Sequence, residues 1–213
     1  MTTAPARPYP LVIGLTGAKG SGKDTACRII MDEYAIEGHP APIRVAFADK
    51  MKDFALRLDP LMDTIVEYGV YRTLNEIVTT IGWEGAKQLP AVRKFIQRLG
   101  TEAGRATFGE DFWVEQVAND VATYLDSGHP VIFTDVRFPN EIEYVMSLGG
   151  EIWRIERPGV DTADPHPSEH AWRALDPNVT IINDGPLEAL HAAIAGNLWG
   201  SWGSQAFTGT ISR

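Results

Sequence analysis

A glycine-rich run that ends in a lysine carries the clearest chemical signal in this chain. The run directly follows the apolar residues 11–15 and consists of Gly17, Ala18, Lys19, Gly20, Ser21, Gly22, Lys23, Asp24 and Thr25. Gly17 and Gly22 permit a turn whose backbone N–H groups converge on phosphate oxygens, and the next helix directs its positive end to the same point. Lys23 can reach the β and γ phosphates of a nucleotide. The pattern predicts a phosphate-binding loop.

Asp24 departs from the common form of this loop, G-x-x-x-x-G-K-[ST], which has a Mg²⁺-binding hydroxyl at that position. A carboxylate can coordinate Mg²⁺ directly or through water, because this cation takes oxygen ligands of either kind. A carboxylate also suits a helix N-terminus electrostatically. The alternative is that Asp24 only caps the helix and Thr25 contacts the metal. The sequence leaves both assignments open.

Short β-branched runs alternate with stretches of helical periodicity along the rest of the chain. The expected strands cover residues 11–16, 43–48, 131–136, 151–156 and 179–183. The expected helices cover residues 23–36, 50–58, 91–104, 112–125, 140–148 and 187–198. Crossovers of this length indicate a parallel sheet with helices on both faces, whose ligands bind at the carboxyl ends of the strands. We therefore expect an α/β fold of the P-loop NTPase type, with three layers (αβα) and a mostly parallel central sheet of about five strands.

Polar residues follow the second and third of these strands. Asp135 ends the third strand, where a carboxylate can hold a metal ion or its waters, although an aspartate there can also serve only as a turn former. Asp49 follows the second strand and would equally cap the next helix. Farther along, Arg98, Glu102 and Arg105 are spaced i, i+4, i+7 and would share one helix face. Such a face could bind a substrate phosphate. The alternative is that the three side chains only form ion pairs with one another in solvent.

The composition fits a compact enzyme of 213 residues, with 44% hydrophobic residues and a formal net charge of −9. An acidic chain without a lysine or arginine block is a poor candidate for binding nucleic acid. The single cysteine, Cys27, excludes a disulfide within the chain and is expected in the core. The chain shows neither a membrane-spanning run nor a secretory signal, which indicates a cytoplasmic protein. The oligomeric state stays open between a monomer and a homodimer.

The domain organisation follows from these segments. Residues 1–10 are expected to be a flexible N-terminus, 11–198 a single domain, and 199–213 a tail whose aromatic residues could dock elsewhere. Residues 161–170 hold acidic residues and two histidines, but a zinc site there is disfavoured because no cysteine accompanies them and the spacing is unfamiliar. A mobile lid over a nucleotide, at about residues 158–172, or an ordinary surface loop is the better interpretation.

Seven short motifs together resemble those of bacteriophage-type deoxynucleoside monophosphate kinases. They are the loop at 17–25, Phe-Ala-Asp-x-Met-Lys at 47–52, Leu-Gly-Thr-Glu-x-x-Arg at 99–105, Phe-Trp at 112–113, Thr-Asp-Val-Arg-Phe-Pro-Asn-Glu at 134–141, Arg-Pro-Gly at 157–159 and His-x-Ser-Glu at 166–169. The resemblance runs from about residue 11 to residue 169. The Gly-Lys-Asp-Thr loop also resembles that of animal-type phosphomevalonate kinases, so another small-metabolite kinase is the alternative.

The resemblance implies transfer of the γ-phosphoryl group of ATP to the 5′-phosphate of a deoxynucleoside monophosphate, in the host cytoplasm if a phage encodes the chain. It implies that Lys23, the loop amides and Arg157 bind ATP, and that Asp24, Thr25 and Asp135 surround Mg²⁺. Arg105 and Arg137 would hold the acceptor phosphate or the transferred group. Within a substrate-binding helical region at about 49–110 and just beyond it, further contacts are implied for Asp49, Lys50, Arg98, Thr101, Glu102 and Trp113.

Overall fold

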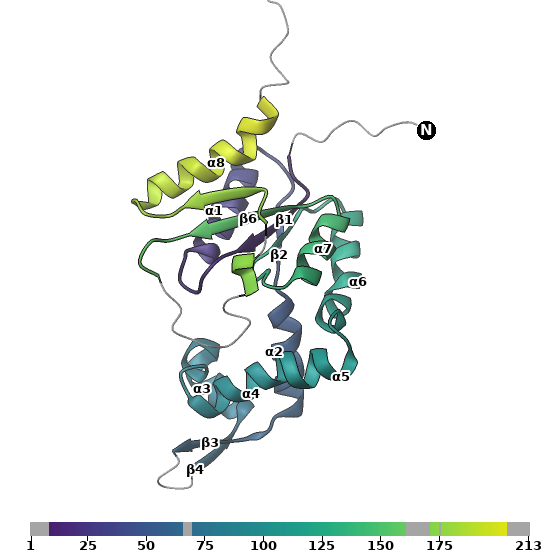
Figure 1. Cartoon of the computed structure of the whole chain (residues 1–213), viewed down its shortest axis with the longest axis vertical. Coiled ribbons are helices and arrows are strands. Elements are labelled where there is room, and N and C mark those ends of the chain that lie inside the picture. The colour runs from purple at the N-terminus through teal and green to yellow at the C-terminus, as the bar shows by residue number, and fades with distance from the viewer. Residues whose placement is uncertain (1–8, 66–69, 161–170, 175, 204–213) are drawn as a thin grey trace, which may run out of the picture. The chain divides into compact units, whose positions relative to one another are not determined.

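The computed structural model describes residues 9–65, 70–160, 171–174 and 176–203. The chain divides into two compact units, and each is described by itself (Figure 1). Unit 1 comprises Met1–Val45 and Asp120–Arg213, and unit 2 comprises Ala46–Asn119.

Unit 1 is built on a five-stranded sheet in the order β2-β5-β1-β6-β7. The strands are β1 (Val12–Thr16), β2 (Ile43–Val45), β5 (Val131–Phe133), β6 (Glu151–Glu156) and β7 (Val179–Ile182). Every neighbouring pair runs parallel, with Val12 of β1 opposite Val131 and Ile13 opposite Glu151. The expected α/β fold with a parallel central sheet is confirmed.

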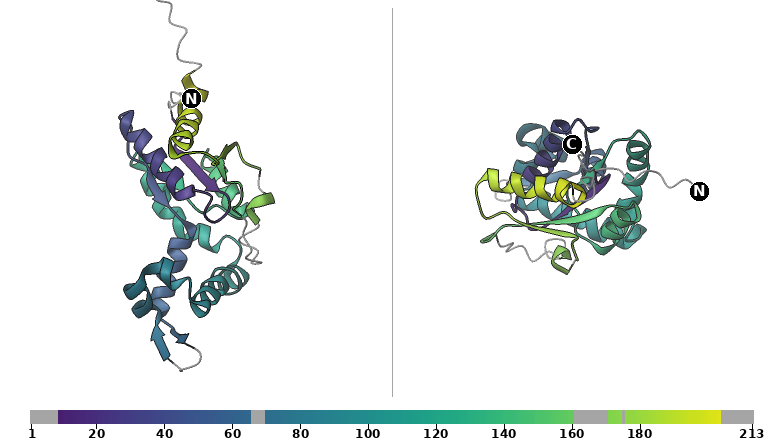
Figure 2. Two further views of the ribbon diagram at one scale, coloured as in Figure 1. Left: turned by 90° about the vertical axis from the view of Figure 1, so that its left-hand side faces the viewer. Right: turned by 90° about the horizontal axis from the view of Figure 1, so that it is seen from above.

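Helices cover both faces of this sheet (Figure 2). On one face, Ile13 and Leu15 share a buried cluster with side chains of α1 (Lys23–Ile36) and α8 (Leu187–Gly203). On the other face, a Cβ added at Gly14 would lie 3.4 Å from Val145 of α7 (Pro139–Ser147). Successive residues of β1 therefore point to opposite helical layers, as the alternation of a strand requires.

Unit 2 is mostly helical, with one antiparallel hairpin. Its elements are α2 (Phe47–Leu58), β3 (Leu61–Ile65), β4 (Val70–Thr73), α3 (Leu74–Ala86), α4 (Pro90–Arg98), a π-helix (Leu99–Arg105) and α5 (Ala106–Phe108). The helix α6 (Phe112–Asp126) begins in unit 2 and ends in unit 1. A buried cluster that includes Leu74, Ile77, Val92 and Leu99 forms the core of this unit.

Several expected elements need correction. The second strand ends at Val45 because α2 begins at Phe47, where the Asp49 N–H already donates to the Ala46 carbonyl in a first helical turn. The hairpin β3–β4 and α3 were not expected at all. The α3 helix begins with a capping box, in which the Thr73 hydroxyl accepts from the Glu76 N–H and the Glu76 carboxylate accepts from the Thr73 N–H.

Two further expectations can be compared with the structure. Cys27 is buried in the cluster between β1, α1 and α8, and burial raises the pKa of its thiol to about 11. A core position was expected for it, and this is confirmed. In the part of the chain that the structure describes, no helix combines the length and the apolar character that crossing a bilayer requires.

Candidate phosphate-transfer site

The glycine-rich run forms a compact loop between the end of β1 and the start of α1. Gly17 and Gly22 both have positive φ angles, 135° and 106°, which glycine adopts readily. A Cβ at Gly17 would lie 2.2 Å from the Ile155 carbonyl oxygen, and one at Gly22 would lie 2.5 Å from Nδ2 of Asn183. Both glycines are therefore required by close packing of the loop against the ends of β6 and β7.

Asn183 supports this loop from the neighbouring strand. It directly follows β7, and its side-chain amide donates a hydrogen bond of 2.8 Å to the Ser21 carbonyl. Its own backbone N–H donates to the Glu156 carbonyl at the end of β6. Sequence reasoning missed this role, because an asparagine after a strand reads as an ordinary turn residue.

Lys23 extends back over the loop rather than away from it. Its ammonium group donates to the carbonyls of Gly17 and Ala18, at 2.8 and 2.6 Å. The hydroxyls of Thr16 and Ser21 are fully buried nearby and have no hydrogen-bond partner among the residues that the structure describes. A buried hydroxyl of this kind is costly unless a partner satisfies it, which phosphate oxygens or water could do.

Asp135 lies beside this loop because its two neighbours extend the hydrogen bonding of the sheet. The Thr134 N–H donates to the Val45 carbonyl, and the Val136 N–H donates to the Leu15 carbonyl of β1. The half-buried Asp135 is therefore fixed at the carboxyl edge of the sheet, next to the strand that leads into the loop. This is the edge at which parallel sheets bind ligands.

Arg137 is set by the start of α7. Its backbone N–H donates to the buried carboxylate of Glu141 at 2.7 Å, and the same carboxylate accepts from Phe138 at 3.1 Å. This contact closes the first turn of the helix. Arg137 and Asp135 thus lie two residues apart on one connection of unit 1.

The donor atoms near the loop suit a hard cation. Asp24 and Thr25 lie in the first turn of α1, and Asp135 offers a third oxygen ligand. Oxygen donors of this kind are those that Mg²⁺ prefers. Among the described residues there is no cluster of histidine, cysteine, aspartate or glutamate that could hold a metal by itself. The disfavoured zinc site at 161–170 lies outside the described residues, as does most of the expected lid at about 158–172.

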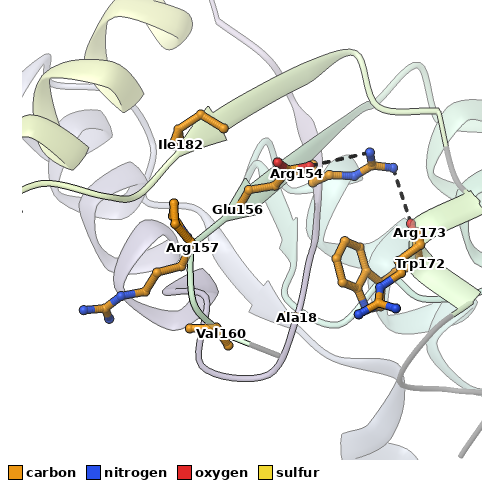
Figure 3. A pocket seen from close by; sticks show the side chains of 9 residues that line it. Ala18, Arg154, Glu156, Arg157, Val160, Trp172, Arg173 and Ile182 are labelled. Carbon is orange, nitrogen blue, oxygen red and sulfur yellow. Dashed lines mark hydrogen bonds and ion pairs between the residues drawn. The ribbon is translucent and has the colours of Figure 1, made fainter. Parts of the chain in front are cut away.

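A cavity of about 400 Å³ adjoins the loop at Ala18 (Figure 3). The Arg154 guanidinium lies 5.8 Å from the ring centre of Trp172, and that of Arg173 lies 5.6 Å from it. Arg154 also donates to the Trp172 carbonyl at 3.4 Å. Arg157 lines the same cavity, with its side chain directed away from Trp172 in Figure 3. Sequence reasoning expected Arg157 to bind ATP but gave no role to Arg154 or to Arg173.

The residues expected to bind an acceptor lie in unit 2, apart from Arg137. Asp49 lies in the first turn of α2, where its carboxylate accepts from Lys52 at 2.6 Å. Lys50 is half-buried on the same helix. The Thr101 hydroxyl donates to the Gln97 carbonyl at 2.8 Å, so this donor is used within the helix.

The expectation that Arg98, Glu102 and Arg105 share one face needs correction. Arg98 and Glu102 do pair at 3.0 Å, with side chains that are 63% and 65% exposed. Arg105 instead donates to the Glu110 carbonyl at 2.8 Å. The reason is that residues 99–105 form a π-helix, whose turns hold more residues than those of an α-helix, so position i+7 no longer returns to the face of position i.

Trp113, which is expected to contact the sugar or the base of the acceptor, lies within unit 2. Its side chain is only 4% exposed, and its indole N–H donates to the Gly100 carbonyl at 2.9 Å. Lys94 and Phe95, which sequence reasoning missed, are better exposed: with Arg98, Leu99, Glu102 and Ala103 they line a cavity of about 500 Å³.

The chain is similar to several viral proteins over most of its length. A relative in Acanthamoeba polyphaga mimivirus is 29% identical over 197 residues, which cover 86% of this chain and 94% of the relative. The deoxynucleotide monophosphate kinase of Enterobacteria phage T4 is 26% identical, with 88% of this chain and 98% of that protein covered. The deoxynucleoside-5′-monophosphate kinase of Escherichia phage T5 is 25% identical, with 62% and 70% covered.

Among solved structures, the Mycobacterium tuberculosis APS kinase CysC in complex with AMPPNP and APS covers 87% of this chain and 95% of its own. At 15% identity and a TM-score of 0.41, this likeness carries no conclusion. The match to a family is decisive instead, because the model of the deoxynucleotide monophosphate kinase family matches residues 43–194. That match includes Asp135, Arg137 and all the residues expected at the acceptor, and by it this chain belongs to the deoxynucleotide monophosphate kinase family.

Proposed function

We propose that this chain transfers the γ-phosphoryl group of ATP to the 5′-phosphate of deoxynucleoside monophosphates. The observation that carries the proposal is the phosphate loop, which the ends of β6 and β7 hold in shape, in a chain whose residues 43–194 match the deoxynucleotide monophosphate kinase family. The loop supplies a site for the donor phosphates, and the family supplies the acceptor class.

On the donor side, the loop amides and Lys23 bind the phosphates of ATP. A loop held by Asn183 and by close packing at Gly17 is preorganised, so little reorganisation is needed when the phosphates enter. Lys23 exchanges its contacts with the Gly17 and Ala18 carbonyls for phosphate oxygens. Arg157, on the cavity beside Ala18, provides a further positive charge for the same nucleotide.

Mg²⁺ fits the oxygen donors of this site. Asp24 or Thr25 in the first turn of α1, together with Asp135, would hold the ion or its waters, and the ion would neutralise charge on the donor phosphates. Both assignments for Asp24 therefore remain. Either Asp24 itself contacts the ion, or Asp24 only caps α1 and Thr25 makes the contact.

On the acceptor side, Arg105 and Arg137 bind the monophosphate or the group in transfer. A guanidinium suits this task, since its planar donors match phosphate oxygens. Asp49, Lys50, Arg98 and Glu102 complete the acceptor site. The polar hydrogens of Thr101 and Trp113 are bonded to the Gln97 and Gly100 carbonyls, so these two residues would contact the acceptor through other atoms. Phosphoryl transfer needs little covalent help from protein, so alignment and charge neutralisation account for the catalysis.

A panel of phosphate acceptors tests this proposal. The full chain is incubated with MgATP and, separately, each deoxynucleoside monophosphate, each nucleoside monophosphate and phosphomevalonate, and ADP formation is measured. We expect turnover with deoxynucleoside monophosphates and none with phosphomevalonate. Turnover of phosphomevalonate alone would replace the proposal with the small-metabolite alternative.

A further inference from the structure

We propose that Trp172 is the residue on which the base of the phosphate donor stacks, in the cavity that adjoins the phosphate loop at Ala18. The inference rests on the proposed function, because that function is what makes ATP the donor. The loop accounts for the phosphates of the donor, and the inference adds a place for its base and sugar. All the residues that line this cavity belong to unit 1.

The cavity has the size and the lining of a site for a small organic molecule. Its volume of about 400 Å³ lies within the range of such sites, about 300 to 1,000 Å³. Its walls combine charged side chains with apolar ones, among them Pro158, Val160, Trp172 and Ile182. A nucleotide needs both kinds of surface, because its base is flat and largely apolar whereas its phosphates are charged.

The charged side chains of the cavity are mostly positive. Arg154, Arg157 and Arg173 line it together with one carboxylate, that of Glu156. This excess of positive charge contrasts with the formal net charge of the chain, which is −9. Guanidinium groups bind phosphate and also stack on aromatic faces. The lining therefore favours an anionic ligand that carries a flat ring over a neutral apolar molecule.

The cavity and the phosphate loop are close enough to serve one nucleotide. Ala18 belongs to the loop and lines the cavity. A Cβ at Gly20 would lie 3.9 Å from the side chain of Val160, which lines the cavity as well. Ile182 directly precedes Asn183, the residue that supports the loop at the Ser21 carbonyl. A nucleotide with its phosphates in the loop can thus place its base in this cavity.

Trp172 is held at both its backbone and its ring. Arg154, with a side chain only 15% exposed, donates to the Trp172 carbonyl at 3.4 Å and lies 5.8 Å from the ring centre (Figure 3). The Arg173 guanidinium lies 5.6 Å from the same ring centre. Both distances fall within the range of cation–π attraction, about 6 Å. A ring held in this way is a preorganised surface for stacking a base.

Trp172→Ala tests this role. Arg154 bonds the main-chain carbonyl, so the substitution removes the ring and not the acceptor of that hydrogen bond. The probes are the Mg²⁺ complexes of AMPPNP, an ATP analogue that resists cleavage, and of inorganic tripolyphosphate, which lacks the nucleoside. Calorimetry measures the Kd of each. We expect the Kd for AMPPNP to rise about tenfold, as loss of base stacking allows, and that for tripolyphosphate to change by less than about twofold.

Two further variants and a control accompany this test. Trp172→Phe keeps an aromatic ring and should retain most of the affinity for AMPPNP. Ile182→Ala, at a side chain that is 50% exposed on the same cavity, serves in case Trp172→Ala does not fold, and should raise the Kd for AMPPNP alone by about threefold. Ile36→Ala is the matched control, since Ile36 is 70% exposed at the end of α1 and does not line the cavity. It should change neither Kd.

The outcomes separate this inference from the proposed function. Equal losses of affinity for AMPPNP and for tripolyphosphate in Trp172→Ala would show that the ring only supports the loop, which overturns the inference while the proposed function stands. Binding of AMPPNP at the parent Kd by both Trp172→Ala and Ile182→Ala would overturn it as well. If the parent chain phosphorylates no deoxynucleoside monophosphate, both are overturned. A loss of affinity for AMPPNP alone supports the inference.

Discussion

At the scale of single residues, the proposed donor site depends on groups whose charge or oxygen atoms would face phosphate. Lys23 is held by the Gly17 and Ala18 carbonyls, so its ammonium group is already at the loop before a nucleotide arrives. Asp24 is exposed at the start of α1, where it can meet a cation. These two side chains give the sharpest tests of the donor site.

Lys23→Ala should leave the fold intact and lower kcat by about a hundredfold or more, because a positioned charge at the transferring phosphoryl group is lost. The measurement is kcat with a deoxynucleoside monophosphate and MgATP, together with the melting temperature. Lys87→Ala is the control, since Lys87 only pairs with Glu84 on α3 at 3.1 Å. Activity of Lys23→Ala within a few-fold of the parent would show that the loop is assigned wrongly.

Asp24→Asn should raise the Mg²⁺ concentration that gives half the maximal rate more than it raises the KM for ATP, because the amide is a weaker ligand than the carboxylate. Asp32→Asn, at an exposed position on the same helix, should change neither value. The rate is measured as a function of Mg²⁺ at fixed ATP. An unchanged Mg²⁺ dependence for Asp24→Asn would transfer the metal contact to Thr25.

At the scale of elements, the ends of strands control the shape of the phosphate loop. β7 brings Asn183 to the loop, and β6 brings the Ile155 carbonyl against Gly17. β5 continues into Thr134 and Val136, whose hydrogen bonds hold Asp135 in place. The sheet thus holds the loop and Asp135, the parts of the proposed donor site, in place.

Asn183→Ala should raise the KM for MgATP about threefold to tenfold, because the Ser21 carbonyl loses its support and the loop must be ordered on binding. The KM for the deoxynucleoside monophosphate should not change. Asn197→Ala is a suitable control, since the Asn197 amide bonds to the Ala193 carbonyl within α8. Equal changes in both KM values would mean that Asn183 supports unit 1 in general rather than the loop.

At the scale of the whole molecule, the proposed donor and acceptor functions fall mostly on different units. Unit 1 carries the phosphate loop, Asp135 and Arg137, whereas unit 2 carries Glu102 and Arg105. The base and the sugar of the acceptor would be recognised in unit 2, where the cavity beside Phe95 and Glu102 offers an aromatic ring and a carboxylate. Selection between deoxyribose and ribose would therefore depend on residues of unit 2.

We expect deoxynucleoside monophosphates to be used with a higher kcat/KM than their ribose counterparts, with more than one base accepted. The resemblance to the family suggests this preference for the deoxy sugar. Its physical cause would be close packing around the 2′ carbon, with Glu102 as one neighbour. Such packing rejects an added hydroxyl by about a hundredfold at most. The test is kcat/KM for each deoxy and ribo pair at fixed MgATP. Equal or higher values for the ribo forms would contradict it.

The sequence by itself predicted the fold class, the phosphate-binding loop and the family; the sheet confirms the fold class, and the match to the family model confirms the family. Short strands alternating with helices predicted the parallel sheet, and the bounds of α1 and β6 were predicted to the residue. These features are local: strand and helix periods repeat over a few residues, and the loop needs its glycines and Lys23 within one short run. Local patterns are what a sequence displays without any knowledge of distant contacts.

Only the tertiary structure decided how distant residues act on these elements. The helical period around Arg98 predicted one α-helix to Gly104, yet Trp113, beyond its end, bonds the Gly100 carbonyl within a π-helix. Asn183 supports the loop through a hydrogen bond to the Ser21 carbonyl, which lies 162 positions earlier in the chain. The hairpin β3–β4 and α3 escaped prediction for a similar reason, because burial against α4 stabilises them more than their own periodicity indicates. Contacts of this range depend on the folded chain and leave no periodic signal in the sequence.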